Sequence, residues 1–351
     1  MKILAVKTHA MGDVLMTTPA IRALKHRFPD SVIHYLTGQW SAPALENNPH
    51  IDTVISVPDS MFHQKRFLRL AKLIMQLRAE RYDACALFQP ARMMRVFAGL
   101  TGARRIVSPG PDGSDQSGST VSQWRACRDR YVAEDFMDVV RLLGTSTGDL
   151  RLEYCVTRDA MERVDRLLLN RHAQSDDFLL VCPGGGRNPR DFVRQKLWPL
   201  DRFAQVIEFA ISDGIPVIMA GGRSDGEYLA SLGDGTGVVN LAGKTSLAEL
   251  AALLTRARML LTNDSAPMHL ALAVGCPFVA IFGPTRRAAL LPASGRFMTV
   301  EAAFPCAPCY DNEPFKACER MDCIQSIDVD TVWKAVCDGW KRWRGQDLEN
   351  D

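Results

Sequence analysis

One stretch of the sequence decides the fold: Leu260-Leu261-Thr262-Asn263-Asp264-Ser265-Ala266-Pro267-Met268-His269-Leu270-Ala271. Its apolar start predicts a strand over Met259–Thr262, which passes through Asn263-Asp264-Ser265 into a stretch with helical periodicity. The unit recurs three times, as strands predicted over Phe178–Cys182, Pro216–Ala220 and Phe278–Phe282 that run into Pro183-Gly184-Gly185-Gly186, Gly221-Gly222 and Gly283-Pro284-Thr285. Helices predicted after Pro199 and Ser246 complete the crossovers of a parallel α/β sheet.

The first half of the chain has the same rhythm. Strands are predicted over Lys2–Val6, Ser31–Leu36, Thr53–Val57, Ala84–Phe88 and Arg105–Val107, and helices over about Val14–Arg27 and Met61–Glu80. Residues 108–122 are predicted to form a long polar loop. The sequence therefore predicts two doubly wound, Rossmann-like α/β domains facing a cleft, with ligands at the carboxyl ends of the strands.

Length and composition support a two-domain globular protein. The chain has 351 residues, of which 47% are hydrophobic and 23% charged, which excludes collagen-like, disordered and small disulfide-scaffold proteins. The longest apolar candidate, Met268–Phe282, is shorter than the about 20 residues of a membrane helix. The apolar start of the chain is too short for a signal peptide. We expect a cytoplasmic protein.

Charge and cysteine content limit the classes of binding partner and of cysteine chemistry that fit the chain. Residues 1–150 carry 19 Lys/Arg against 14 Asp/Glu, a surplus of five, whereas the remainder carries 23 against 26. Such a surplus suits an anionic small molecule or a membrane surface and argues against nucleic acid. Ten cysteines without an export signal predict thiols or a metal site, not a disulfide framework.

Three features indicate chemistry at the strand ends. Asp264 and Ser265 begin a helix, where backbone N–H groups favour a phosphate, and His269 lies one turn on; the alternative is a helix cap and a core histidine. Gly12 allows a tight turn and Asp13 begins the next helix, with an ordinary N-cap as the alternative. Lys196 follows the glycine loop and can neutralise a diphosphate, unless it is a solvated surface charge.

Five segments stand out in order along the chain: Lys7-Thr8-His9-Ala10-Met11-Gly12-Asp13-Val14-Leu15-Met16-Thr17-Thr18-Pro19, Lys196-Leu197-Trp198-Pro199, Asn240-Leu241-Ala242-Gly243-Lys244-Thr245-Ser246-Leu247, Asp264–His269 and Phe282-Gly283-Pro284-Thr285. Together they resemble glycosyltransferase family 9, the heptosyltransferase family, over nearly the whole chain. The resemblance implies a GT-B fold. It also implies an inverting, metal-independent transfer of a sugar from a nucleotide diphosphate, with ADP-heptose as donor and a lipopolysaccharide-type glycan as acceptor.

The resemblance also implies roles for individual residues. Asp13 matches the base that deprotonates the acceptor hydroxyl, and Lys196 matches the lysine at the donor phosphates. The remaining donor-binding residues would be Gly184, Asp225, Thr245, Asp264, Ser265, Ala266 and His269. In this assignment Asp225 meets donor hydroxyls and Thr245 the nucleobase. The chain departs from the family in Lys7-Thr8-His9, where Arg-x-Ser is common, in Ala266 for Gly, and in a longer loop over Arg187–Gln195.

The acceptor is expected to bind the first domain through Gly12, Arg66, Arg92 and Arg125. A basic helix face carries Lys65, Arg66, Arg69 and Lys72, followed by Arg92, Arg95, Arg125 and Arg128. Guanidinium groups suit the phosphates and carboxylates of a lipid-linked anionic glycan. The alternative is a solvated basic face. An acceptor of this kind also implies peripheral contact with the cytoplasmic face of the inner membrane.

Four cysteines, Cys306, Cys309, Cys318 and Cys323, leave two alternatives open: a structural zinc or iron, as in some relatives, or reduced thiols without metal. If a metal is present, we expect it to be structural and remote from the chemistry. No cofactor is expected for catalysis.

The domain prediction follows the resemblance. Residues 1–155 form the acceptor-binding domain, 156–327 the nucleotide-sugar-binding domain with a cysteine-rich loop at 306–323, and 328–351 a helix that packs back on the core. That helix, about Val329–Arg344, carries an apolar stripe that indicates a buried face, with a membrane-binding face as the alternative. Asp328 is predicted to cap it.

Two other functions fit the same architecture. A nucleotide-sugar epimerase or hydrolase would bind the donor but need no acceptor, and a non-catalytic protein would bind a nucleotide sugar or metal without turnover. Asp13, placed apart from the donor loop, favours transfer.

Overall fold

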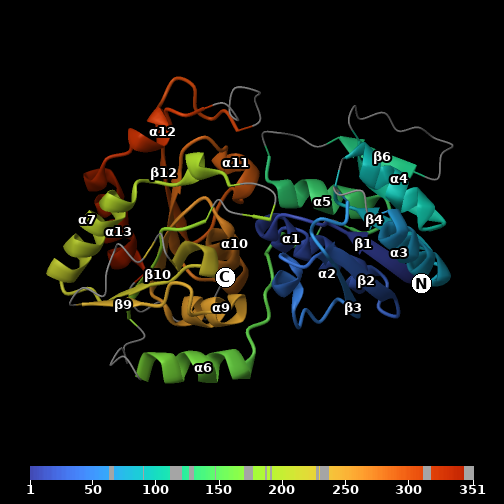
Figure 1. Cartoon of the computed structure of the whole chain (residues 1–351), viewed down its shortest axis with the longest axis horizontal. Coiled ribbons are helices and arrows are strands. Elements are labelled where there is room, and N and C mark those ends of the chain that lie inside the picture. Colours follow the sequence, from blue (N-terminus) through green and yellow to red (C-terminus); the bar gives the residue numbers. More distant parts are fainter. Residues whose placement is uncertain are drawn as a thin grey trace. The chain divides into compact units, whose positions relative to one another are not determined.

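The computed structural model describes residues 1–62, 67–89, 91–110, 121–125, 130–146, 148–169, 177–185, 188–189, 192–226, 229, 237–310 and 318–343. The chain divides into two compact units (Figure 1). The first domain is Met1–Cys155 with Ala288–Pro292, and the second is Val156–Arg287 with Ala293–Asp351. Each has its own parallel sheet, so each is described by itself.

The first domain contains a six-stranded parallel sheet in the order β3-β2-β1-β4-β5-β6. Its strands are β1 Lys2–Val6, β2 Val32–Gly38, β3 Thr53–Val57, β4 Ala84–Leu87, β5 Arg105–Gly110 and β6 Val121–Arg125. The chain winds outward from β1 to one edge and then from β4 to the other. The switch point of this doubly wound sheet therefore lies between β1 and β4.

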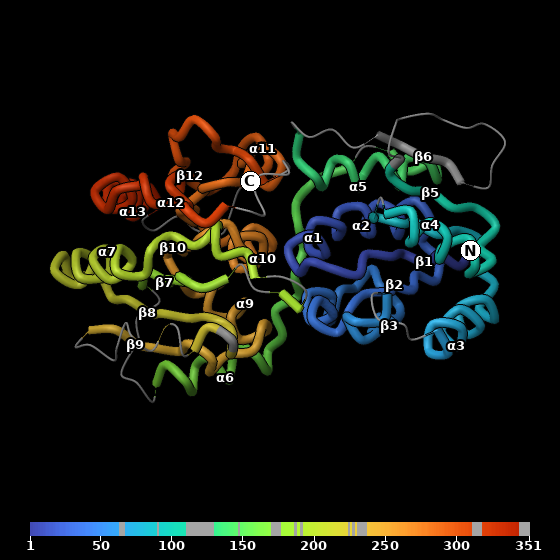
Figure 2. Tube along the Cα trace, turned by 45° about the horizontal axis from the view of Figure 1, so that its top comes forward, coloured from blue at the N-terminus to red at the C-terminus, as the bar shows by residue number. Residues whose placement is uncertain are grey.

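Helices cover both faces of this sheet (Figure 2). They are α1 Met11–Leu15, α2 Thr18–Arg27, η1 Ala42–Leu45, α3 Phe67–Ala79, α4 Arg92–Leu100 and α5 Val132–Arg141. Leu4 and Val6 of β1 belong to one core cluster with side chains of α3 and α4. The alternating residues Ile3 and Ala5 are also fully buried and face the other side of the strand, since successive side chains alternate.

Two predictions for the first domain need correction. The single helix predicted over Val14–Arg27 is two helices, because the chain begins a new helix at Thr18 with Pro19 in its first turn, where proline is favoured. Both predicted boundaries of the loop over 108–122 are wrong, since β5 continues to Gly110 and β6 begins at Val121. Residues 111–120 lie outside the described part of the chain.

The second domain repeats the topology with a six-stranded parallel sheet in the order β12-β11-β10-β7-β8-β9. Its strands are β7 Leu179–Cys182, β8 Val217–Met219, β9 Val238–Asn240, β10 Met259–Asn263, β11 Phe278–Phe282 and β12 Phe297–Glu301. Here the switch point lies between β7 and β10. The short edge strands β9 and β12 were not predicted from the sequence.

The helices of the second domain are α6 Arg158–Leu169, η2 Arg194–Lys196, α7 Leu200–Ser212, η3 Arg223–Asp225, α9 Leu247–Arg256, α10 Ala266–Val274, α11 Arg287–Leu290, α12 Asp322–Gln325 and α13 Val329–Arg342. All residues of α11 except Arg287 belong to the first compact unit. Side chains of α7 and α13 share one core cluster with β7, β10 and β11.

The C-terminal helix α13 has the buried face that the apolar stripe predicts. Val332 and Val336 are fully buried in this core cluster. The carboxylate of Asp328 accepts from the Thr331 amide at 2.7 Å, which confirms the predicted N-cap. None of the helices in the described part of the chain combines the length and apolar character needed to cross a membrane.

Candidate active site

The donor-binding residues predicted from the sequence follow neighbouring strands of the second sheet. Asp264 and Ser265 follow β10, Gly184 follows β7, Asp225 follows β8 and Thr245 follows β9. In sheet order these strands are β10-β7-β8-β9. Carboxyl ends of parallel strands meet at one edge, so the sequence-predicted residues gather there, on both sides of the switch point.

Lys196 and Asp264 form the charged centre of this group. The Lys196 ammonium lies 2.8 Å from the Asp264 carboxylate, and their side chains are only 15% and 3% exposed. A buried carboxylate needs such a partner, because an unpaired buried charge is costly. The surface-charge alternative for Lys196 is therefore wrong. An ammonium has three N–H donors, so Lys196 can bind Asp264 and an anion together.

The side-chain amide of Asn263 joins the three segments that carry the site. It is fully buried at the end of β10. Its Nδ2 donates to the Pro183 carbonyl at 2.7 Å, and its Oδ1 accepts from the Trp198 amide at 3.0 Å. The glycine loop, the Lys196 segment and the Asp264 strand are thereby held at fixed distances.

Glycine is required where the loop after β7 meets its neighbours. A Cβ at Gly184 would lie 2.6 Å from the carboxylate carbon of Asp225. At Gly185, which has φ +118°, a Cβ would lie 2.6 Å from the Ser265 Cβ. No L side chain fits either position without displacement, so the glycines let the backbone lie directly against Asp225 and Ser265.

Helix α10 begins at Ala266, with Ser265 in the N-cap position. The Ser265 hydroxyl makes no capping bond and lies 3.3 Å from both the Thr262 hydroxyl and the Asn263 carbonyl. Ser265 therefore occupies the N-cap position without the side-chain bond of a cap. Pro267 in the first turn lacks an N–H, which leaves fewer backbone donors than most helix ends offer. His269 is buried one turn further on.

Thr245 lies between β9 and α9. The turn before it is anchored by the Gly243 amide, which donates to the Gly221 carbonyl at 3.0 Å. After it, Ser246 and Glu249 form a reciprocal capping box at the start of α9. Thr245 is thus fixed on the strand β8–β9 side of the site.

In the first domain Asp13 pairs with Lys7. The Lys7 ammonium, on a side chain only 8% exposed, lies 2.6 Å from the Asp13 carboxylate. The sequence predicts that Asp13 begins a helix. In the structure it lies in the first turn of α1, after the N-cap Ala10. Gly12 lies inside that helix, so the prediction that it makes a tight turn is wrong.

The switch point of the first sheet contributes a hydrogen-bonded group that the sequence analysis missed. The Thr8 amide, just past β1, donates to the Gln89 side-chain oxygen at 2.8 Å, just past β4. The His9 Nδ1 lies 2.9 Å from the Thr8 hydroxyl and 3.2 Å from Gln89 Nε2. A polar residue two positions after each of two adjacent buried strands was the signal that could have identified this group.

The predicted acceptor residues are only partly described. Arg92 is the exposed first residue of α4, and Arg125 is the last residue of β6. Arg66, Lys65 and Arg128 lie outside the described residues. Arg69 and Lys72 lie exposed on α3. Helices α3 and α4 together carry Arg69, Lys72, Arg78, Arg92 and Arg95 and contain no acidic residue.

The four clustered cysteines line a cavity of about 250 Å³ together with Gln195 and Pro284. Cys306 is exposed, Cys323 is buried in α12, and the other two are half-buried. Within the described ranges, no set of three or more His, Cys, Asp or Glu residues is arranged to hold a metal ion. The zinc or iron prediction is therefore not supported.

The cysteines are thiols. All nine that the structure describes are free, which agrees with the prediction that the chain has no disulfide framework. Burial raises the pKa of Cys309 and Cys323, and neighbouring cysteines add to the shift. A metal at this cluster was expected to be remote from the chemistry. The cluster lies beside the candidate site, because the Cys318 carbonyl accepts from the side chain of Gln195, next to Lys196.

The chain is similar to known proteins in both sequence and structure. Glycosyltransferase family 9 (heptosyltransferase) matches residues 70–318. Lipopolysaccharide heptosyltransferase 3 of Escherichia coli is 27% identical over 289 residues, which are 78% of this chain and 81% of that protein. Among solved structures, the glycosyl transferase family 9 of Veillonella parvula has a TM-score of 0.83 at 23% identity, with 97% of each chain covered.

The E. coli ADP-heptose lps heptosyltransferase II has a TM-score of 0.74 at 20% identity and covers 97% of this chain and 99% of its own. These structural likenesses show the fold, and they confirm the GT-B class predicted from the sequence.

We expect Asn263→Ala to destabilise the second domain. The change leaves the Pro183 carbonyl and the Trp198 amide buried without their partner, a loss of about 2–5 kcal/mol for two such groups. Guanidinium unfolding measures it. The matched control is Gln205→Ala on the exposed face of α7, with an expected change within about 0.5 kcal/mol. An unchanged unfolding midpoint for Asn263→Ala would show that the amide contributes no net stability.

Proposed function

The chain belongs to glycosyltransferase family 9, and we propose that it transfers a heptose, or a closely related sugar, from an ADP-sugar to a lipopolysaccharide-type surface glycan. The observation that carries the proposal is the buried Lys196–Asp264 pair at the switch point of the second sheet. The names of the similar proteins, which include an ADP-heptose transferase, support the donor.

In this proposal the second domain binds the donor. Lys196 and the start of α10 at Ser265 and Ala266 face the diphosphate, with Gly184 close to it. His269 and Asp264 contact the phosphates and sugar, Asp225 the sugar hydroxyls, and Thr245 the nucleobase. The row of strand ends supports this order, because Thr245 and Asp225 lie on the β8–β9 side and Asp264 on the β10 side.

The proposed reaction is an inverting displacement with Asp13 as general base. Asp13 takes the proton of the acceptor hydroxyl while that oxygen forms a bond to the anomeric carbon, and the bond from that carbon to the diphosphate breaks. A carboxylate has two oxygens, so Asp13 can accept from Lys7 and from the acceptor hydroxyl together. Lys196 and the helix start stabilise the charge on the departing ADP without a divalent cation.

The acceptor is proposed to be a lipid-linked anionic glycan bound by the first domain through Gly12, Arg66, Arg92 and Arg125. The basic, acid-free helices α3 and α4 support this, since they suit phosphate and carboxylate groups. A cytoplasmic protein in peripheral contact with the inner membrane would meet such an acceptor. Nucleic acid has no role in this proposal.

Acceptor-dependent release of ADP from ADP-heptose by the purified chain tests the activity. Turnover of the donor without acceptor would instead indicate an epimerase or hydrolase. Tight donor binding without turnover would indicate a binding protein.

We expect Asp13→Asn to bind the donor normally but to lose about 10²- to 10⁴-fold in kcat, the usual cost of removing a general base. Steady-state kinetics and donor titration measure the two effects. Asp30→Asn, an exposed carboxylate in the same domain, is the control and should leave both unchanged. A near-normal kcat for folded Asp13→Asn would reduce Asp13 to a structural partner of Lys7.

We expect transfer to continue in EDTA, whereas Lys196→Ala should lose donor affinity and kcat together. Lys196 supplies the positive charge that a metal would otherwise provide at the diphosphate. ADP-release assays with and without chelator, followed by addition of Mg²⁺, measure this. If EDTA abolishes turnover of the folded chain and Mg²⁺ restores it, the role given to Lys196 is wrong.

For Arg92→Ala we expect a KM for acceptor raised by about two- to fivefold, as for a single exposed charge contact, with donor KM unchanged. The increase should shrink as salt screens the interaction. Arg66→Ala and Arg125→Ala are expected to act alike, whereas Arg104→Ala, 82% exposed in the same domain, is the control. Wild-type acceptor kinetics for all three variants at low salt would place the acceptor elsewhere.

A further inference from the structure

The cysteine-bearing segment is attached to both loops beside Lys196. The amides of Cys309 and Tyr310 both donate to the Pro284 carbonyl, at 2.8 and 2.9 Å, just past the end of β11. On the other side, Gln195 Nε2 donates to the Cys318 carbonyl at 3.1 Å. Gln195 directly precedes Lys196, so the described parts of this segment, 304–310 and 318–323, lie at the same strand ends as the candidate site.

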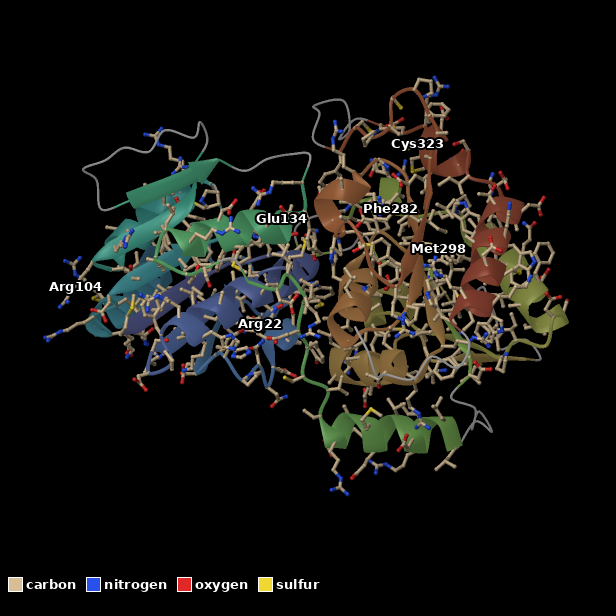
Figure 3. All side chains as sticks on the ribbon, turned by 180° about the vertical axis from the view of Figure 1, so that it is seen from behind. Arg22, Arg104, Glu134, Phe282, Met298 and Cys323 are labelled. Carbon is tan, nitrogen blue, oxygen red and sulfur yellow. The ribbon has the colours of Figure 1, made fainter. Side chains whose placement is uncertain are left out.

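Helix α12 continues this attachment. A Cβ at Gly283 would lie 2.9 Å from the Cδ1 of Ile324, so glycine is needed for α12 to approach the end of β11. Figure 3 shows the labelled Cys323 and Phe282 at the same end of the second domain. The segment is therefore packed onto the sheet and can influence the side chains at its strand ends.

Among the described residues of this segment, Tyr310 contacts the candidate site through Lys196. The Lys196 ammonium lies 4.5 Å from the centre of the Tyr310 ring. An aromatic face attracts a cation at this distance through the negative face of its quadrupole. The Lys196 ammonium thus contacts both the Asp264 carboxylate, at 2.8 Å, and the Tyr310 ring.

Two contacts on one ammonium restrict where it can lie. A lysine side chain has four rotatable carbon–carbon bonds, so one contact at its end leaves it more than one geometry. The ring adds a second restraint from a backbone that Pro284 fixes by two hydrogen bonds. Lys196 is thereby held in place before any anion arrives.

We propose that Tyr310 is a positioning residue for Lys196, through which the cysteine-bearing segment takes part in donor binding. Its effect on the reaction rests on the proposed function, in which Lys196 binds the donor diphosphate. The effect on the lysine itself does not, because the contact exists in the protein alone. The two effects are therefore tested separately.

The first test uses ADP binding to the full-length protein. Tyr310→Leu removes the ring and should weaken ADP binding by about 3- to 30-fold, the range that the interaction of a cation with a ring spans. Tyr310→Phe keeps the ring and should bind within about twofold of wild type. The control is Phe209→Leu, which replaces an aromatic residue of similar exposure near the C-terminal end of α7 and should leave ADP affinity unchanged. Tyr310 is 42% exposed, so its replacement should not prevent folding.

The second test needs no ligand. An amine-acetylating reagent should modify Lys196 faster in Tyr310→Leu than in wild type or Tyr310→Phe, as read by mass spectrometry of the peptide that carries it. If wild type binds no ADP but this pattern of acetylation holds, the proposed function fails and the positioning role stands. Equal acetylation rates in all three proteins would overturn the positioning role. So would an equal loss of ADP affinity in Tyr310→Phe and Tyr310→Leu, because the hydroxyl and not the ring would then matter.

Discussion

The fully buried amide of Asn263 is the constraint on which the second-domain site depends. One side chain accepts from the Trp198 amide and donates to the Pro183 carbonyl, so three segments far apart in sequence share one anchor. A side-chain amide can satisfy both backbone groups, because it offers an acceptor and a donor on a short side chain. The Lys196–Asp264 pair is possible because this anchor brings the two loops together.

The two domains solve the same problem at the same point of the fold. Each sheet reverses its winding between its first and fourth strand, and each places a lysine–aspartate pair beside that switch point. The pairs differ in burial. Asp264 is 3% exposed and Asp13 is 39% exposed. The more accessible carboxylate suits a base that must meet an acceptor hydroxyl, and the buried one suits a support for a lysine that binds an anion.

Much of this could be predicted from the sequence, because strands that end in glycine or polar residues reveal both the sheet and its binding edge. That pattern alone placed Asp264, Ser265 and Gly184 together, whereas Asp225 came from the family resemblance. Contacts between distant segments could not be predicted. The ring of Tyr310 beside Lys196 has no local sequence signal, since the two residues lie 114 positions apart. The cysteine spacing was compatible with metal, but spacing does not determine the side-chain geometry, and among the described residues no such set is arranged to hold a metal ion.

In the proposed reaction the donor diphosphate binds at the switch point of the second domain. Hydrogen–deuterium exchange of the full-length protein with and without ADP measures where this binding takes place. We expect slower exchange in peptides covering 183–185, 194–198 and 262–269, with peptides covering residues 2–15 unchanged. Protection of residues 2–15 without protection of the second-domain segments would contradict it.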